Sequence, residues 1–288
     1  YFSSSYVWRK ISTVSIARIR ISKTPNKRHS YSCRLCAERM SCMNLKDFRL
    51  KPISDTEIAD LNSGAIIDTR KSSASIRIAR AIYNNYHLRE TPPLPEEPFE
   101  RLSDRDFTPL LEVTVEDDGW VPCHNHRDCA TKTGIHVSLK NPSDNISLTR
   151  KCLHLNASWG WHSYIPSFKP IQATARLYIG GRSEPSSIAR IVECLTDSIS
   201  DRWRLKFSYT SMANRPDAVT IYMTQHDIHQ IVSNAPNELR FLGDPPGFVK
   251  TSDGIAYATV SPSVTTESFG WIKSKVEADK LLTVLGRS

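Results

Sequence analysis

The stretch "WRLKFSYTSMANRPDAVTIYM", residues 203–223, decides the fold of this chain. Its first part alternates apolar and polar residues, its middle is rich in turn-forming residues, and its last part is a second β-branched run. This pattern predicts an antiparallel β-hairpin. The hairpin also carries four chemically active side chains, Lys206, Arg215, Asp217 and Tyr222. Such a combination belongs either to an anion site or to a solvated face.

The remaining sequence alternates irregularly between helical and β-like patterns. Helical periodicity predicts helices in residues 72–88, 185–200, 224–232 and 267–285. Ser72 or Ser73 is the expected N-cap of the first helix, and Thr224 that of the third, with Asp227 at its third helical position. Short β-like runs occupy residues 110–117, 134–139, 145–155 and 173–181. Because no regular βαβ alternation is present, we expect an α+β fold in one domain, a mostly antiparallel sheet flanked by helices.

The composition limits the classes of function. The chain has 288 residues, 39% of them hydrophobic and 24% charged, which is typical of a soluble globular protein. A net charge of +8 favours anionic partners, unless the charge has no functional use. Nucleic-acid binding is not predicted, because the strands carry no basic and aromatic stripe. No membrane span is expected, since no run of about 20 apolar residues occurs. Seven cysteines, an odd number, predict free thiols in a reducing cytosol.

The first 42 residues differ from the rest of the chain. They contain nine Lys or Arg residues and a single acid, Glu38, and the next residue is Met43, which opens a stretch of ordinary composition. A transit peptide or a basic arm has this composition as well. We expect residues 1–42 to be a non-native or disordered basic extension and residues 43–288 to form the domain.

Familiar cofactor and metal motifs are incomplete in this chain. Gly180 and Gly181 belong to neither a phosphate-binding loop nor a dinucleotide fingerprint, and "HRD" at residues 126–128 lacks the other protein-kinase motifs. "CRLCAERMSC" at residues 33–42 lacks a second ligand pair. "CHNHRDC" at residues 123–129 is one tight loop, whereas a tetrahedral site needs ligands from more than one. We therefore predict no cofactor, no metal and no phosphate transfer from ATP.

Six short elements appear in an order that resembles the HopA-type effector family, which includes lyase components of lanthipeptide and thioamitide biosynthesis. The resemblance covers roughly 200 residues, from Tyr83 to Leu282. The elements are "IYNNY", "DDGW", "ARLYI", "WRLKF", "RPDAVTIY" and "ESFG". Two departures affect the expected substrate fit. Lys273 and Lys275 stand where the family often has Arg, and "IPSFKP" replaces a glycine-aromatic element.

The resemblance implies β-elimination of phosphate from phosphoserine or phosphothreonine in a peptide, which leaves a dehydroamino acid. It also implies a phosphorylated precursor peptide, a separate kinase-like protein that phosphorylates it, and a place in the bacterial cytoplasm. The alternative is a non-enzymatic effector that a type III system secretes into a host cell and that acts by binding partner proteins.

The implied reaction needs a phosphate anchor and a base. Arg176 and Arg215 are the expected anchors, because a guanidinium fork binds phosphate oxygens in pairs and keeps its charge. Lys206 is the expected base if burial lowers its pKa, and otherwise it is a strand lysine that faces water. Tyr178 and Tyr222 are expected either to contact phosphate or peptide through their hydroxyls or to belong to the core.

The proton donor is expected among three histidines, His136, His154 and His162. His136 is the first choice, because "KTGIHVSL" is similar to the Lys-x-His strand of phosphothreonine lyases, although Lys132 lies four residues before it rather than two. A single histidine in an apolar strand is otherwise a packed residue. Asp217 is expected to hold Arg215 or Lys206 in position.

Overall fold

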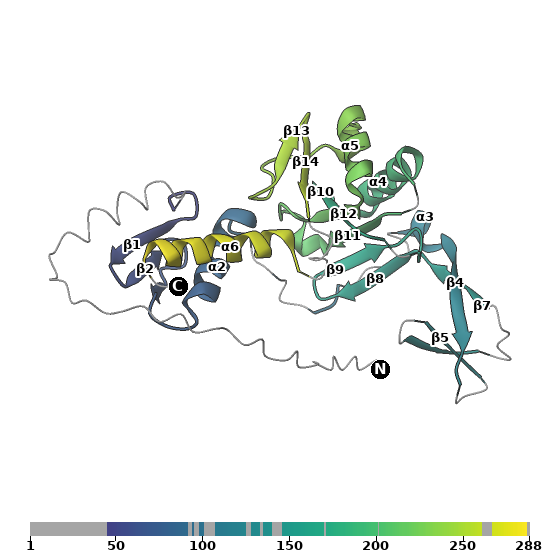
Figure 1. The fold of residues 1–288 in the computed structure, drawn as a ribbon. Coiled ribbons are helices and arrows are strands. Elements are labelled where there is room, and N and C mark those ends of the chain that lie inside the picture. Colours follow the sequence, from purple (N-terminus) through teal and green to yellow (C-terminus); the bar gives the residue numbers. More distant parts are fainter. Residues whose placement is uncertain are drawn as a thin grey trace.

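The computed structural model describes residues 45–91, 94, 98–100, 107–124, 128–132, 135–139, 146–169, 171–200, 202–260 and 267–286. The predicted extension of residues 1–42 lies outside this range. The described chain combines helices with antiparallel sheets of three, seven and four strands, so the predicted α+β class is confirmed (Figure 1). Among the described helices, none has the length and apolar character that a membrane crossing requires.

The seven-stranded sheet forms the centre of the molecule and has the order β13-β14-β10-β12-β11-β9-β8, with every neighbouring pair antiparallel. Its strands are β8 (Leu153–Ser158), β9 (Trp161–Tyr164), β10 (Ala175–Ile179), β11 (Arg204–Ser208), β12 (Val219–Met223), β13 (Lys250–Ser252) and β14 (Ile255–Thr259). The predicted hairpin is the adjacent pair β11 and β12, joined through the 3₁₀ turn η2 (Thr210–Met212). The strands β9, β13 and β14 were not predicted.

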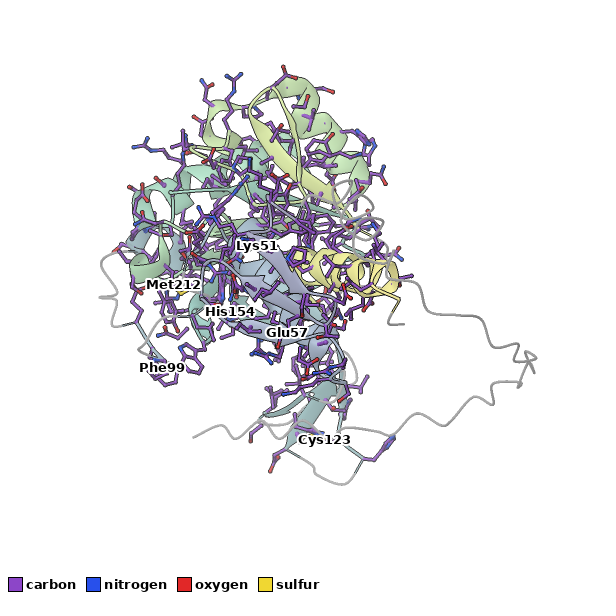
Figure 2. The ribbon with its side chains drawn as sticks, turned by 90° about the vertical axis from the view of Figure 1, so that its left-hand side faces the viewer. Lys51, Glu57, Phe99, Cys123, His154 and Met212 are labelled. Carbon is purple, nitrogen blue, oxygen red and sulfur yellow. A yellow bond between two sulfur atoms is a disulfide. The ribbon has the colours of Figure 1, made fainter. Side chains whose placement is uncertain are left out.

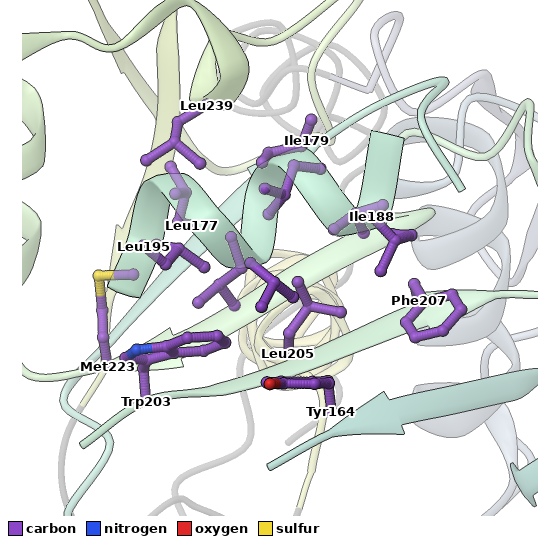
Figure 3. Packing of buried hydrophobic residues seen from close by; sticks show 14 of the residues in the cluster. Tyr164, Leu177, Ile179, Ile188, Leu195, Trp203, Leu205, Phe207, Met223 and Leu239 are labelled. Carbon is purple, nitrogen blue, oxygen red and sulfur yellow. The ribbon is translucent and has the colours of Figure 1, made fainter. Parts of the chain in front are cut away.

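Two helices cover one face of this sheet. They are α4 (Pro185–Ser198) and α5 (Gln225–Asn234), both close to their predicted ranges. Figure 3 shows Ile188 of α4 packed with Leu177 and Leu205 of the strands, and all three are fully buried. The predicted N-cap of α5 is confirmed, because Thr224 and Asp227 form a reciprocal capping box.

At one end of the molecule lie two long helices and a small sheet (Figure 1). They comprise α2 (Ala74–Ile82), the π-helix η1 (Tyr83–His87), α6 (Phe269–Val284), and the strands β1 (Leu50–Ser54), β2 (Glu57–Asp60) and β3 (Ile66–Asp68). The sequence pattern did not predict the three strands. Ser73 occupies the predicted N-cap position of α2 but makes no side-chain capping bond, whereas Ser268 at α6 accepts one from the N–H of Trp271.

The four-stranded sheet has the order β6-β5-β4-β7 and extends away from the central sheet (Figures 1 and 2). Its strands are β4 (Thr114–Pro122), β5 (Cys129–Lys132), β6 (Ile135–Ser138) and β7 (Ile146–Lys151). The predicted strand at residues 110–117 begins later, because Leu110 and Leu111 belong to the short helix α3 (Thr108–Leu111). The predicted run at residues 145–155 is two strands in different sheets, divided at Cys152.

Cys123 and Cys129 form a disulfide at the end of β4 and the start of β5. The prediction of free thiols is therefore wrong for Cys123 and Cys129. These two cysteines are only six residues apart in the sequence. Among the described cysteines, Cys152 and Cys194 are free.

Candidate functional site

The strand register divides the central sheet into an apolar face and a polar face. Residues directly opposite each other in antiparallel strands point to the same side. Arg176 lies opposite Tyr222, which lies opposite Arg204, and the next row continues from Tyr178 across the sheet. We call the side away from α4 and α5 the polar face. It carries His154, Trp161, Ser163, Arg176, Tyr178, Arg204, Lys206, Ser208, Thr220 and Tyr222.

Lys206 occupies the middle of the polar face. Its Nζ lies 3.8 Å from the ring centroid of Trp161, so the ammonium rests on an aromatic surface. Burial lowers the pKa of Lys206 to about 8, and Asp217 opposes this shift, while Arg215 and Arg176 add to it. With a pKa near 8, roughly a tenth of the Lys206 amine is neutral at pH 7. A minor fraction of the Lys206 amine can therefore accept a proton at neutral pH.

Arg215 and Asp217 form a buried ion pair beside Lys206. The Nε and Nη2 atoms of Arg215 donate to the two carboxylate oxygens of Asp217 at 2.8 and 2.9 Å. The structure thus places Asp217 against Arg215, one of its two expected partners. Arg215 also contacts the Tyr83 hydroxyl, and its Cζ lies 5.3 Å from the Trp161 centroid. These contacts hold Arg215 in one orientation.

Arg176 is buried on the neighbouring strand β10, with 4% of its surface exposed. Its Nη2 donates to the backbone carbonyl of Glu267 at 2.7 Å, and its Cζ lies 5.2 Å from the Tyr222 ring centroid. The guanidinium also lies within hydrogen-bonding reach of the Tyr178 hydroxyl. Burial raises the pKa of both Tyr178 and Tyr222, so both phenols are protonated at neutral pH.

Buried polar atoms without a hydrogen-bond partner are concentrated on the polar face. The described residues contain seven such side-chain atoms, and four belong to this face: His154 Nε2, Arg176 Nε, Arg204 Nε and Ser208 Oγ. Each costs about 1–3 kcal/mol when it stays unpaired. Because folded proteins satisfy nearly all buried polar groups, these atoms mark the polar face as a place where water or a ligand would complete the hydrogen bonds.

Arg204 also lies on the polar face and lines a cavity there, and it was not singled out in the sequence. It stands two residues before Lys206 on β11, and the period-two pattern of "WRLKF" already places both on one face. Its Nε is buried and has no hydrogen-bond partner among the described residues. The resemblance drew attention to Arg176 and Arg215 instead.

A cavity of about 370 Å³ opens against this face. Trp161, Ser163, Arg204, Lys206 and Tyr222 contribute to its lining, and its size suits a small ligand or one side chain of a peptide. Neither Arg176 nor Arg215 lines this cavity. Arg215 borders a second cavity of about 310 Å³, together with Gly180, Gly181 and Asn214.

Of the three candidate histidines, only His154 lies on the polar face. It stands opposite Ser163, which stands opposite Lys206, so two strand spacings, roughly 10 Å, separate His154 from the lysine. Burial lowers the pKa of His154, and Arg150 adds to this shift. The neutral imidazole is therefore its main form at pH 7.

His162 projects from the opposite face and has a structural environment. Its Nδ1 accepts from the N–H of Asn156 at 2.9 Å, so its proton lies on Nε2, which is 2.9 Å from a Glu100 oxygen. Burial lowers the pKa of His162, while Glu100 opposes the shift. Both ring nitrogens are already in use, as expected for a packed histidine.

His136, the first choice for the proton donor, is not brought to Lys206. It lies on β6 of the four-stranded sheet, where its Nδ1 is 3.5 Å from the sulfur of Cys123. Lys132, the other half of the "KTGIH" similarity, forms an ion pair with the buried Asp117. Figure 2 shows Cys123 at the outer end of this sheet and His154 in the body of the molecule. Lys132 and His136 therefore belong to the four-stranded sheet, whereas Lys206 belongs to the seven-stranded sheet.

His87 is a further buried group near the site. It ends the π-helix η1, an element often found at functional sites, and its Nδ1 lies 2.7 Å from the Gly247 carbonyl oxygen. Burial lowers the pKa of His87, and among the charged groups that influence it are Asp217, Arg215 and Arg176. The π-helix η1 contains most of the "IYNNY" element, which ends one residue before His87, so this histidine was not singled out in the sequence.

Comparison with known proteins leaves the family open. No family model matches the sequence, and no curated protein matches it. Among solved structures, the chain is similar to "the effector protein from Pseudomonas syringae pv. tomato strain DC3000" with a TM-score of 0.34 and 17% sequence identity. That match covers 43% of this chain and 56% of the effector chain. Membership in the HopA-type effector family therefore stays a prediction.

Proposed function

We propose that this protein binds a phosphoserine or phosphothreonine peptide on the polar face and eliminates its phosphate, with Lys206 as the base. The observation that carries the proposal is the group of unpartnered donors around a lysine of lowered pKa. Arg204 Nε and Ser208 Oγ stand two residues before and after Lys206 on one strand, and Arg176 Nε lies on the same face.

The charges of this face fit a phosphate dianion. Asp217 neutralises Arg215, but within the described part of the chain neither Arg176 nor Arg204 has a carboxylate partner. Their two positive charges match the charge of about −1.5 to −2 on a phosphorylated side chain. Buried charge is stable only when it is paired. We therefore assign the anchoring of phosphate to Arg176 and Arg204, with Arg215 as a neighbouring fixed charge.

The proposed step uses the groups around the cavity. The neutral amine of Lys206 takes the proton from the substrate α-carbon, and the electrons of that C–H bond form the Cα=Cβ double bond. The Cβ–O bond breaks, and phosphate leaves with its electron pair. Tyr222 lines the same cavity and keeps its proton at neutral pH, so its hydroxyl is placed to donate a hydrogen bond to the departing oxygen. His154 is the second candidate donor.

Mass spectrometry of a synthetic phosphoserine peptide incubated with the full chain tests the proposal. The wild type should produce a peptide lighter by one phosphoric acid. Lys206→Met should lower the rate by about 10²- to 10⁴-fold, the usual contribution of a positioned base. Lys250→Met is the matched control, since Lys250 is an exposed lysine of the same sheet. Elimination that persists unchanged in Lys206→Met would contradict the assignment of the base.

Phosphopeptide binding without chemistry is the second candidate function. It is favoured by the charge state of Lys206, because a pKa of about 8 leaves most of its amine charged at pH 7. Under this alternative the protein is an effector or interaction protein, and its place is a host cell rather than the bacterial cytoplasm. The same incubation separates the two functions. Binding alone is supported if the peptide binds the wild type, binds Arg204→Met less tightly and never loses mass.

The proposed lyase also needs a separate kinase-like protein as its partner, because its substrate must already be phosphorylated.

A further inference from the structure

Three side chains with metal-binding atoms meet at the outer end of the four-stranded sheet. The Nδ1 atom of His136 lies 3.5 Å from the sulfur of Cys123 and 3.7 Å from that of Cys129. All three ligand atoms lie within 4.8 Å of one another. None of them takes part in the site on the polar face.

The strand pairing explains why these atoms converge. Thr131 of β5 lies opposite Val121 of β4 and opposite His136 of β6. With the two-residue period of a strand, Cys123 and Cys129 point to the same side as His136. The N–H of Cys123 donates to the carbonyl of Cys129 at 2.8 Å, which extends the pairing to the ligand positions.

The donor set suits zinc. Zn²⁺ prefers thiolate sulfur and imidazole nitrogen, and sites with three protein ligands leave a fourth position for water or another group. The sequence argued against a metal because "CHNHRDC" is a single tight loop. His136 removes this objection, because it comes from a different strand beyond the loop and the next turn.

We propose that the reduced protein binds one Zn²⁺ ion through Cys123, Cys129 and His136, and that the disulfide is the alternative state of the same site. Reduction of the disulfide by a thiol or phosphine reductant takes up two electrons and two protons and gives two thiols. Metal binding then releases both thiol protons, since the thiolates are the ligands. The site is open to solvent, because Cys123 and Cys129 are half-buried and His136 is exposed.

The neighbouring contacts hold β4 and β5, the strands next to the two cysteines, in place independently of the metal. The buried carboxylate of Asp117 on β4 pairs with Lys132 of β5 and, at 3.0 Å, with Arg150 of β7. Lys132 and Arg150 lower the pKa of Asp117 against the opposing effect of burial, so the carboxylate is charged at neutral pH. The strands β4, β5 and β7 are therefore joined whether the cysteines are oxidised, reduced or metal-bound.

Titration of the reduced full chain with Co²⁺ under anaerobic conditions tests the proposal. One Co²⁺ per chain should bind with a sulfur-to-cobalt charge-transfer band, and added Zn²⁺ should abolish the band. Cys123→Ser and Cys129→Ser should each remove it, and His136→Ala should weaken Co²⁺ binding at least tenfold. Cys194→Ser and His226→Ala are matched controls from the central domain region and should bind as the wild type does.

A second measurement needs no variant. In the reduced wild type, Zn²⁺ should protect Cys123 and Cys129, but not Cys194, from alkylation as read by peptide mass spectrometry. A reduced protein that binds no Co²⁺ and gains no protection would leave the disulfide as the sole role of the pair and overturn the proposal. If His136→Ala bound Co²⁺ with the same charge-transfer band and the same affinity as the wild type, the histidine would not be a ligand, and this result would also overturn the proposal.

Discussion

The two faces of the central sheet differ in how completely their side chains are satisfied. On the apolar face, Leu177, Leu205 and Ile221 are fully buried against α4 and α5. On the polar face, Arg204 and Ser208 carry buried atoms without partners. Both faces are built from the same strands, because successive strand residues point to opposite sides. The apolar face therefore contributes stability through burial, whereas the polar face keeps buried polar atoms that have no partner among the described residues.

The strand β11 allows the sharpest comparison, because Leu205 and Lys206 are neighbours in sequence and lie on opposite faces. Leu205→Ala should lower the free energy of unfolding by about 2–5 kcal/mol, since it leaves a cavity under α4 and α5. Lys206→Met should leave it unchanged or raise it, because burial already disfavours the charged amine. Urea denaturation measures both. Equal losses in the two variants would remove the distinction between the faces.

A second prediction concerns the end of the polar face that α6 covers. A Cβ at Gly270 would collide with the imidazole ring of His87, whose Nδ1 contacts the Gly247 carbonyl oxygen. Gly270→Ala should therefore destabilise the protein by about 1–3 kcal/mol, although alanine favours helix formation. Ser274→Ala on the same helix is the control, because its buried hydroxyl has no partner among the described residues. A stabilised Gly270→Ala protein would show that α6 is free to move away.

The third prediction is a pH dependence of stability. Lys206 has a pKa of about 8 in the folded chain and about 10.4 when unfolded, so the unfolded state binds more protons between these values. The destabilisation from Lys206 is fully present below pH 8 and disappears as the pH rises toward 10.4. The stability of the wild type relative to Lys206→Met should increase by about 2–3 kcal/mol over this interval. A constant difference would mean that Lys206 is freely solvated.

The smallest effect is expected at the helix that covers the apolar face. Thr224→Ala removes the capping box of α5 and should reduce stability by about 1 kcal/mol. Ser73→Ala at the N-cap of α2 should have almost no effect, because Ser73 makes no capping bond. Thermal denaturation of both variants measures the difference. A larger loss at Ser73 would reverse the assignment of the two caps.

Elements with strong local patterns were predictable. The hairpin of β11 and β12, the apolar stripe of α4 and the cap of α5 follow from period two, period 3.6 and capping chemistry. The short strands β1 to β3, β5, β9, β13 and β14 were missed, because three to five residues provide little periodicity and their pairing depends on distant partners. Arg204 was within reach of the same pattern that identified Lys206.

Which residues share a site depended on contacts that no local pattern contains. Arg176 meets Tyr222 only because β10 pairs with β12, although α4 and β11 lie between these two strands in the sequence. His136 joins two cysteines instead of Lys206, because β6 pairs with β5 in a separate sheet. The alternation along a strand determines which side chains lie on one face, so the sequence alone determines this feature. The neighbours of that face come from the order of strands in the sheet, which only the folded chain establishes.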